Sequence, residues 1–149
     1  MNTLSITNNI QTRDQRYFVV ELAVDGSPLA DFTSYATALE ALHRSATEPG
    51  EHYILTCWCG IPECAGIYSG FTVQHDGIGI HWHIMEPEPE RHFTFEASAY
   101  RAVIDRCISD ARDLLHHDPP PDKGTLSVVP DDNAYFLGIY PWPDKTHAA

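Results

Sequence analysis

Hydrophobic and polar residues alternate along residues 78–84, which is the pattern of a strand with one buried face. Three isoleucines and a tryptophan fall on one face, and His81 and His83 fall on the other. An Asp-Gly pair at 76–77 predicts a tight hairpin with a strand at 67–74. Other stretches rich in β-branched and aromatic residues are also predicted strands, namely 16–24, 93–95, 126–129 and 134–140.

One further strand is predicted at residues 52–58, where both sets of alternating positions carry aliphatic, aromatic or thiol side chains. A strand of this composition is expected to be central in its sheet and covered on both sides. It leads directly into a short loop that contains cysteines.

Two stretches repeat apolar residues at the three- and four-residue spacing of an amphipathic helix. The longer stretch runs from about residue 97 to residue 116. The shorter one ends before a Glu-Pro-Gly sequence at 48–50, and Thr37 with Glu40 fits a capping box at its start.

The order of predicted elements is β-α-β-β-β-β-α-β-β, with short turns between most strands. The predicted fold class is therefore α+β, with a mainly antiparallel sheet of about five to seven strands and two helices packed on one face. The chain of 149 residues is expected to form a single domain, 1–149, because no repeat or linker divides it. Residues 1–15 and 141–149 are predicted to be loosely ordered ends.

Net charge is the feature of the composition that says most about possible partners. The chain has 9 Lys and Arg residues against 21 Asp and Glu residues, which gives a formal net charge of −12. Such a field repels nucleic-acid phosphates and anionic membranes, so neither is an expected partner. The sequence shows no secretory leader and no apolar run of about 20 residues, and a cytoplasmic location is expected.

Acidic residues gather in two proline-containing loops, which supply Glu86, Glu88 and Glu90 and then Asp131 and Asp132. Solvated charges of this kind often serve only solubility. They also suit a basic protein partner, whose encounter the acidic field would accelerate. The first hypothesis is a non-enzymatic acidic binding protein, such as an immunity-type inhibitor of a basic toxin or nuclease.

Three of the four cysteines lie within eight residues, in the pattern Cys57-x-Cys59-Gly60-x3-Cys64. Structural zinc sites use four thiolates or imidazoles at tetrahedral positions, and this loop offers three. The candidate metal set is completed by His83, and the other candidates for the fourth ligand are His81, His52 and Cys107. A zinc-binding structural module centred on the loop is therefore the alternative hypothesis, and small buried thiols are the simplest interpretation.

Catalysis by these thiols would require a lowered pKa and a base within reach. The sequence contains no Cys-x-x-Cys pair, no H-E-x-x-H and no G-x-S-x-G. No catalytic residue is predicted, and a thiol enzyme is the third hypothesis.

From residue 54 to residue 108, several sequence features follow one another in the order found in a family of proteins. They are an apolar strand, Cys57-Trp-Cys59-Gly60, Cys64, Val73, Trp82, Phe93-Thr-Phe95, Glu96 and Tyr100. In this region, a little over a third of the chain, the sequence resembles a family of small, uncharacterised bacterial proteins. The link between Trp82 and Phe93 is shorter and more acidic than the family pattern. The resemblance implies the same fold and an important cysteine loop, and it implies no activity.

Overall fold

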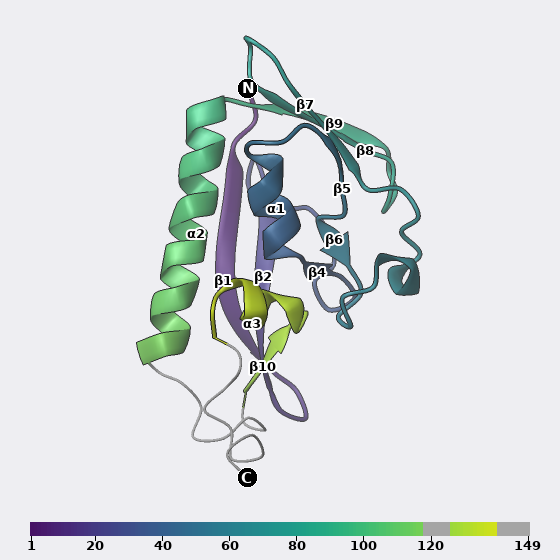
Figure 1. The fold of residues 1–149 in the computed structure, drawn as a ribbon. Helices are drawn as coiled ribbons and strands as arrows, with labels where there is room; N and C mark the ends of the chain where they lie inside the picture. The colour runs from purple at the N-terminus through teal and green to yellow at the C-terminus, as the bar shows by residue number, and fades with distance from the viewer. Residues whose placement is uncertain (118–125, 140–149) are drawn as a thin grey trace.

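The computed structural model describes residues 1–117 and 126–139 (Figure 1). The helices among these residues are α1 (Leu39–Ser45), α2 (Ala97–His117), α3 (Asp132–Phe136) and the 3-10 helix η1 (Pro62–Ala65). The strands are β1 (Leu4–Thr12), β2 (Arg16–Val24), β3 (Ser27–Pro28), β4 (Ala36–Thr37), β5 (Gly50–His52), β6 (Leu55–Thr56), β7 (Phe71–His75), β8 (Ile80–Ile84), β9 (Arg91–Phe95) and β10 (Leu126–Val129).

The strands form three sheets. The first has the order β1-β2-β10, with β3 also paired to β2, and the second has the order β5-β7-β8-β9. The short strands β4 and β6 pair only with each other. All pairs are antiparallel except β10 with β2. The predicted α+β class is confirmed, but the strands are divided among several sheets and α3 adds a helix to the two that were predicted.

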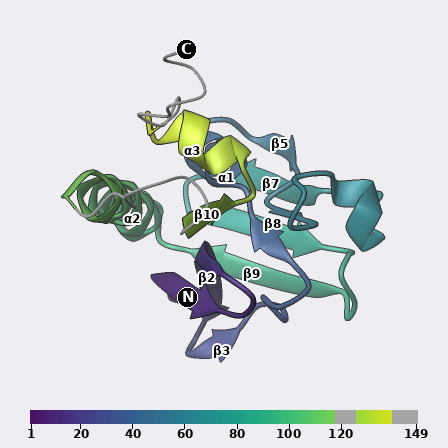
Figure 2. The same cartoon turned by 90° about the horizontal axis from the view of Figure 1, so that it is seen from below.

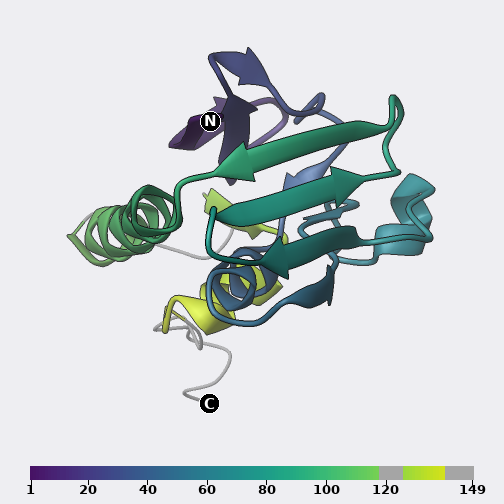
Figure 3. The ribbon, with the colours of Figure 1, turned by 90° about the horizontal axis from the view of Figure 1, so that it is seen from above.

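The two larger sheets lie across each other. Figure 3 shows β9, β8, β7 and β5 side by side above the end of the first sheet, and Figure 2 shows the first sheet nearly end-on from below. A parallel bridge between Asn2 and Phe95 joins the start of the first sheet to β9. The helix α2 runs along β1, while α1 contacts β5, α2 and α3. The core fills the space between these layers.

An aromatic cluster forms the part of the core beneath β8. The Trp82 ring lies 5.1 Å from Phe71, 4.8 Å from Phe95 and 5.9 Å from Tyr100 between centroids. The Tyr100 hydroxyl accepts a hydrogen bond from Trp82 Nε1 at 3.0 Å and shares another with Ser45 Oγ at 2.6 Å. Burial raises the pKa of Tyr100 to about 12. These polar ends therefore connect β8, α2 and α1 inside an apolar core.

A buried asparagine joins the start of α1 to the C-terminal part of the chain. Asn133 is 1% exposed, and its Oδ1 accepts a hydrogen bond from the Leu39 amide at 2.9 Å. Its Nδ2 donates to the carbonyls of Thr37 at 2.9 Å and Val129 at 3.4 Å. The Leu39 amide is one of the donors that a helix start leaves without an intrahelical partner. Asn133 thus caps α1 from 94 residues away.

The predicted capping box at the start of α1 is wrong. Thr37 lies in β4, and its hydroxyl donates to the Val20 carbonyl at 2.8 Å. Glu40 forms an ion pair with Arg44 at 2.8 Å. The N-cap position is Ala38, which has no side-chain oxygen to offer.

The prediction that residues 1–15 are loosely ordered is wrong as well. Strand β1 pairs with β2 along its whole length, from Leu4 opposite Val24 to Thr12 opposite Arg16. Leu4 is buried, and the Asn8 side chain donates to the Cys107 carbonyl of α2 at 3.3 Å. Polar residues dominate β1 because it is an edge strand, so its sequence resembles a loose end. The predicted tail 141–149 lies outside the described residues.

Two predicted strands have different structures. Residues 132–136 form α3, in which Asn133 and Ala134 are buried, and residue 140 lies outside the described part. The predicted central strand at 52–58 is reduced to β6, which pairs with β4 alone. Ile54 and Leu55 are nevertheless buried, so the apolar character of this stretch reflects packing in the core and not a central place in a sheet.

We expect Asn133→Ala to lower the free energy of unfolding by about 1–3 kcal/mol, because it leaves the buried Leu39 amide without an acceptor. Urea denaturation followed by circular dichroism measures this change. Asp131→Ala is the matched control, since Asp131 is exposed and makes no side-chain cap, and it should change stability by less than about 0.5 kcal/mol. Equal stability of the two variants would contradict the role given to Asn133.

Candidate functional site

The cysteine loop begins where β6 ends and is closed by backbone hydrogen bonds. The Gly60 amide donates to the Cys57 carbonyl at 2.9 Å, and the Cys57 amide donates to the Ile61 carbonyl at 3.3 Å. Gly60 has a φ of +91°, a left-handed conformation that side chains disfavour. The helix η1 then brings Cys64 back toward the start of the loop.

Trp58 anchors this loop to the first sheet. Its Nε1 donates to the Phe32 carbonyl at 3.1 Å, and its ring packs edge-on against Tyr17 at 5.1 Å between centroids. The Arg13 guanidinium lies 4.6 Å from the centre of the indole ring. Because these contacts hold Trp58, they also restrict the backbone of its neighbours Cys57 and Cys59.

The thiols of Cys57, Cys59 and Cys64 form a three-thiol cluster with Cys59 at its centre. The groups that act most strongly on the Cys59 thiol are the Ile61 backbone and the thiols of Cys57 and Cys64. Hydrogen bonds with these groups lower the pKa of Cys59. The pKa of Cys64 is raised, first because its thiol donates to Cys59 and then because of the nearby Cys59 charge. All three cysteines are free, and Cys59 and Cys64 are exposed.

None of the predicted fourth ligands is found among the hydrogen-bond partners of the three-thiol cluster in the described residues. His52 contacts the Glu48 carbonyl, and His81 contacts Asp76 and Thr94. His83 contacts Glu90, and Cys107 contacts Asn8. Burial, with a smaller effect of Asp110, raises the pKa of Cys107 to about 12. The structure therefore keeps Cys57, Cys59 and Cys64 in one loop and places His83 elsewhere, with Glu90 and His92.

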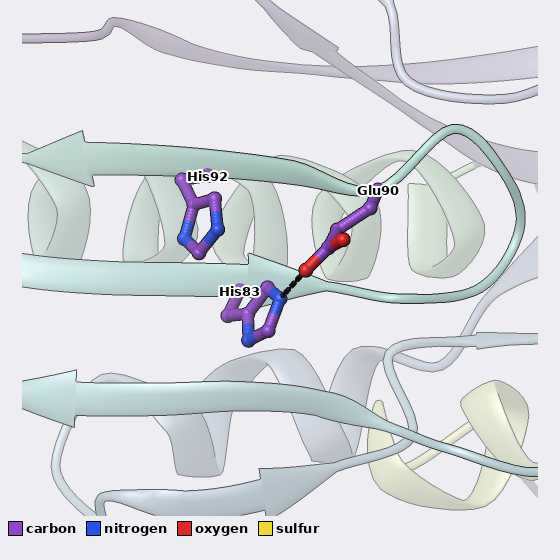
Figure 4. A group of neighbouring side chains, drawn as sticks. All are labelled: His83, Glu90 and His92. Atoms are coloured by element: carbon purple, nitrogen blue, oxygen red, sulfur yellow. Dashed lines mark hydrogen bonds and ion pairs between the residues drawn. The ribbon is translucent and has the colours of Figure 1, made fainter.

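His83 belongs instead to a group on the outer face of the second sheet. His83 on β8 lies directly opposite His92 on β9, and their rings are stacked with 4.2 Å between centroids. Glu90, just before β9, has its Oε2 2.5 Å from His83 Nε2 (Figure 4). One ligand atom from each residue lies within 4.8 Å of the other two. We call His83, Glu90 and His92 the His–Glu group.

The sequence predicted only part of the His–Glu group. The alternation at 78–84 placed His83 on the face away from the core, and Trp82 is indeed buried while His83 is only half-buried. His92 was missed because the predicted strand began at residue 93. Extending that strand by two residues would have placed His92 and Thr94 on one face, but the register with β8 could not be read from the sequence.

Two glutamates hold the segment that leaves the cysteine loop. The Glu86 carboxylate accepts hydrogen bonds from the amides of Tyr68 at 2.8 Å and Ser69 at 2.9 Å. The Glu51 carboxylate accepts one from the Gly70 amide at 3.1 Å. The conformation of residues 68–70 is therefore fixed by acidic side chains from β5 and from the loop after β8.

An acidic surface with two exposed apolar side chains results. Tyr68 is 69% exposed and Ile61 is 51% exposed, and a backbone hydrogen bond of 3.1 Å from Ile67 to Pro62 keeps their segments together. Desolvation raises the pKa of the neighbouring Tyr53, and the charges of three glutamates raise it further. We call this surface the Tyr68 face, which comprises Ile61, Tyr68, Glu51, Glu63 and Glu86.

The remaining predicted acidic residues take different positions. Asp132 adjoins the cysteine loop, because a Cβ added to Gly60 would lie 3.8 Å from its Oδ2. Glu88 and Asp131 are exposed. Asp132 at the start of α3 thus adjoins the cysteine loop, Glu86 contacts the segment that leaves it, and Glu90 contacts His83.

The fold and these sites define an α+β protein with an acidic, thiol-bearing loop. Comparisons of the chain with protein families, curated proteins and solved structures find no match. The family resemblance stays a prediction. Among the residues that the structure describes, no helix has the length and apolar character needed to cross a membrane.

At neutral pH we expect Cys59 to react with iodoacetamide faster than the other cysteines, because its lowered pKa increases the thiolate fraction. Cys107 should stay unmodified in the folded protein, since it is buried and its pKa is raised. A time course with peptide mass spectrometry measures each rate, and Cys59→Ser should abolish the fast phase. Faster labelling of Cys64 than of Cys59 would contradict the arrangement described.

Proposed function

We propose that this chain is a non-enzymatic binding protein whose Tyr68 face receives a basic partner protein. The observation that carries this proposal is the convergence of Glu51, Glu63 and Glu86 on Tyr53, whose hydroxyl donates to the carbonyl of the exposed Tyr68 on a fixed loop. An immunity-type inhibitor that covers the basic active site of a toxin or nuclease has these properties. The formal net charge of −12 supports the same class of partner.

The geometry of residues 68–70 favours binding because their backbone is already held in place before a partner binds. Tyrosine offers a large apolar ring with a polar end, and such residues contribute much of the energy of many interfaces. The backbone amides of Tyr68 and Ser69 are already fixed by Glu86. A preorganised segment loses less conformational entropy on association than a mobile one does.

The glutamates of the Tyr68 face would act mainly on the rate and the selectivity of association with the partner. Opposite charges at the edge of an interface accelerate encounter and exclude acidic competitors, and salt screens them. In the described residues, no histidine is among the groups that shift the pKa of Cys59 or Cys64. A base for thiol catalysis is therefore not found there, which favours binding over catalysis.

The first experiment identifies the partner with a photo-crosslinking residue at position 68 and measures its affinity, once purified, by calorimetry. We expect Tyr68→Ala to weaken binding by at least about tenfold, because it removes the central apolar contact. Ile78→Ala is the matched control, since Ile78 is 67% exposed but lies at the opposite end of the β7–β8 hairpin. It should bind as the wild-type chain does.

Affinity for the same purified partner, measured at several salt concentrations, tests whether charge contributes to binding. Affinity should fall as salt rises, and Glu63→Gln should reduce that salt dependence, because Glu63 is exposed and its charge acts on this face. Binding that is unchanged at high salt, or an equal loss in Tyr68→Ala and Ile78→Ala, would contradict the proposal.

The three-thiol cluster supports a second candidate function, a zinc-binding module. Cys57, Cys59 and Cys64 would supply three thiolates, and their side chains would have to rotate to close the site, because among the described residues only His83, Glu90 and His92 have ligand atoms that all lie within 4.8 Å of one another. Three protein ligands leave one tetrahedral position for water or for a group from a partner. In this arrangement His83 is not the fourth ligand, because it lies with Glu90 and His92.

We expect protein purified without added metal to contain about one equivalent of zinc if the cluster binds it, and a chelator to lower the melting temperature. Elemental analysis and thermal denaturation measure the two quantities. Cys59→Ser should lose the metal, whereas Cys107→Ser, at the thiol outside the cluster, should keep it. Less than about a tenth of an equivalent, with a melting temperature insensitive to chelator, would exclude this function.

A further inference from the structure

We propose that the His–Glu group binds a late first-row divalent transition-metal ion, of which Zn²⁺ is the probe used below. The site lies on the outer face of the second sheet and shares no residue with the three-thiol cluster or the Tyr68 face. Its ligands would be one ring nitrogen from each of His83 and His92 and a carboxylate oxygen of Glu90.

Strand register places the two imidazoles where a metal can bridge them. His83 and His92 are direct cross-strand partners, and residues so placed have Cβ atoms about 4.5–5.5 Å apart. Metal–nitrogen and metal–oxygen distances near 2.0–2.2 Å require ligand atoms about 3–3.5 Å apart. The present ligand atoms lie within 4.8 Å of one another, so rotation of side chains is enough to close the site.

The backbone beneath the site is rigid, whereas the ligands can rotate. Strand β8 is paired on both sides, by β7 and β9, and its opposite face carries Trp82, which is 1% exposed. The side chain of His83 is 35% exposed and that of Glu90 is 55% exposed. Ligands mounted on fixed strands are held at defined separations, and this is a requirement for a metal site.

Glu90 already approaches His83 as a ligand would. Its Oε2 and His83 Nε2 are 2.5 Å apart and share a hydrogen bond (Figure 4). A metal bound between them would replace this hydrogen bond and separate the two atoms to about 3–3.5 Å. A cation bound there would also offset the carboxylate charge. The neighbouring His81 is not available in the same way, because its two ring nitrogens contact Thr94 at 2.9 Å and Asp76 at 2.8 Å.

The donor set decides the class of metal. Two imidazoles and a carboxylate suit zinc, copper(II) and nickel(II), whereas Mg²⁺ and Ca²⁺ prefer oxygen ligands alone. Copper(I) prefers sulfur, which this group lacks. Three protein ligands would leave the remaining positions to water.

The site is tested by calorimetric titration of Zn²⁺ into the Cys57→Ser, Cys59→Ser, Cys64→Ser triple variant, which removes the thiol ligands. We expect saturable binding of one equivalent. Adding His83→Ala or His92→Ala should weaken it by at least about tenfold, because each removes one of three ligands. Adding His81→Ala should change the affinity by less than about twofold, since this histidine shares the face but not the group. Circular dichroism and thermal denaturation check that each variant is folded.

A second measurement locates the ion independently of mutation. Cu²⁺ added to the triple variant should selectively broaden the backbone amide resonances of residues 82–84 and 90–93 in NMR spectra. Absence of saturable Zn²⁺ binding would overturn the proposal. So would affinity unchanged by His92→Ala, a loss on His81→Ala as large as that on His92→Ala, or broadening centred elsewhere.

Discussion

The carboxamide of Asn133 is the contact on which much of the molecule depends, because it satisfies backbone groups of three segments at once. It binds the start of α1, the β4 carbonyl of Thr37 and the end of β10. Strand β4 in turn pairs with β6, from which the cysteine loop departs. The position of that loop therefore depends on a side chain that belongs to none of the three candidate sites. A buried amide with all its partners present stabilises one arrangement strongly, since any alternative leaves polar groups unsatisfied.

The acidic residues of the Tyr68 face are structural as well as electrostatic. Glu86 and Glu51 hold backbone amides of residues 68–70, so the same carboxylates that attract a basic partner also shape the surface that meets it. The loop that carries Glu86 also carries Glu90 of the His–Glu group. The Tyr68 face and the His–Glu group thus both depend on the loop that joins β8 to β9.

The sequence predicted those helices and strands in which buried residues recur at a regular spacing. The bounds of β2, the buried face of β8 and the long helix α2 all follow from regular spacing of apolar residues. Strand β1 was missed because an edge strand covered by one helix needs few apolar residues, and Leu4 alone is fully buried. The capping of α1 by Asn133 and the pairing of His83 with His92 could not be predicted, because both depend on register between distant segments. The sequence singled out Cys57, Cys59 and Cys64 together because they are close in the chain, but it did not predict that Cys59 and Cys64 are exposed.

The parallel pairing of β10 with β2 has a consequence for the order of synthesis. Strand β2 is completed early, yet its second neighbour and the residue that caps α1 lie more than one hundred positions later. A chain emerging from the ribosome therefore exposes the free edge of β2 and an uncapped α1 until residue 133 is available. Contacts of such long sequence separation slow folding, and open strand edges invite wrong pairing meanwhile. Residues 126–139 thus complete the described core only after the sheet and helix that they contact have been synthesised.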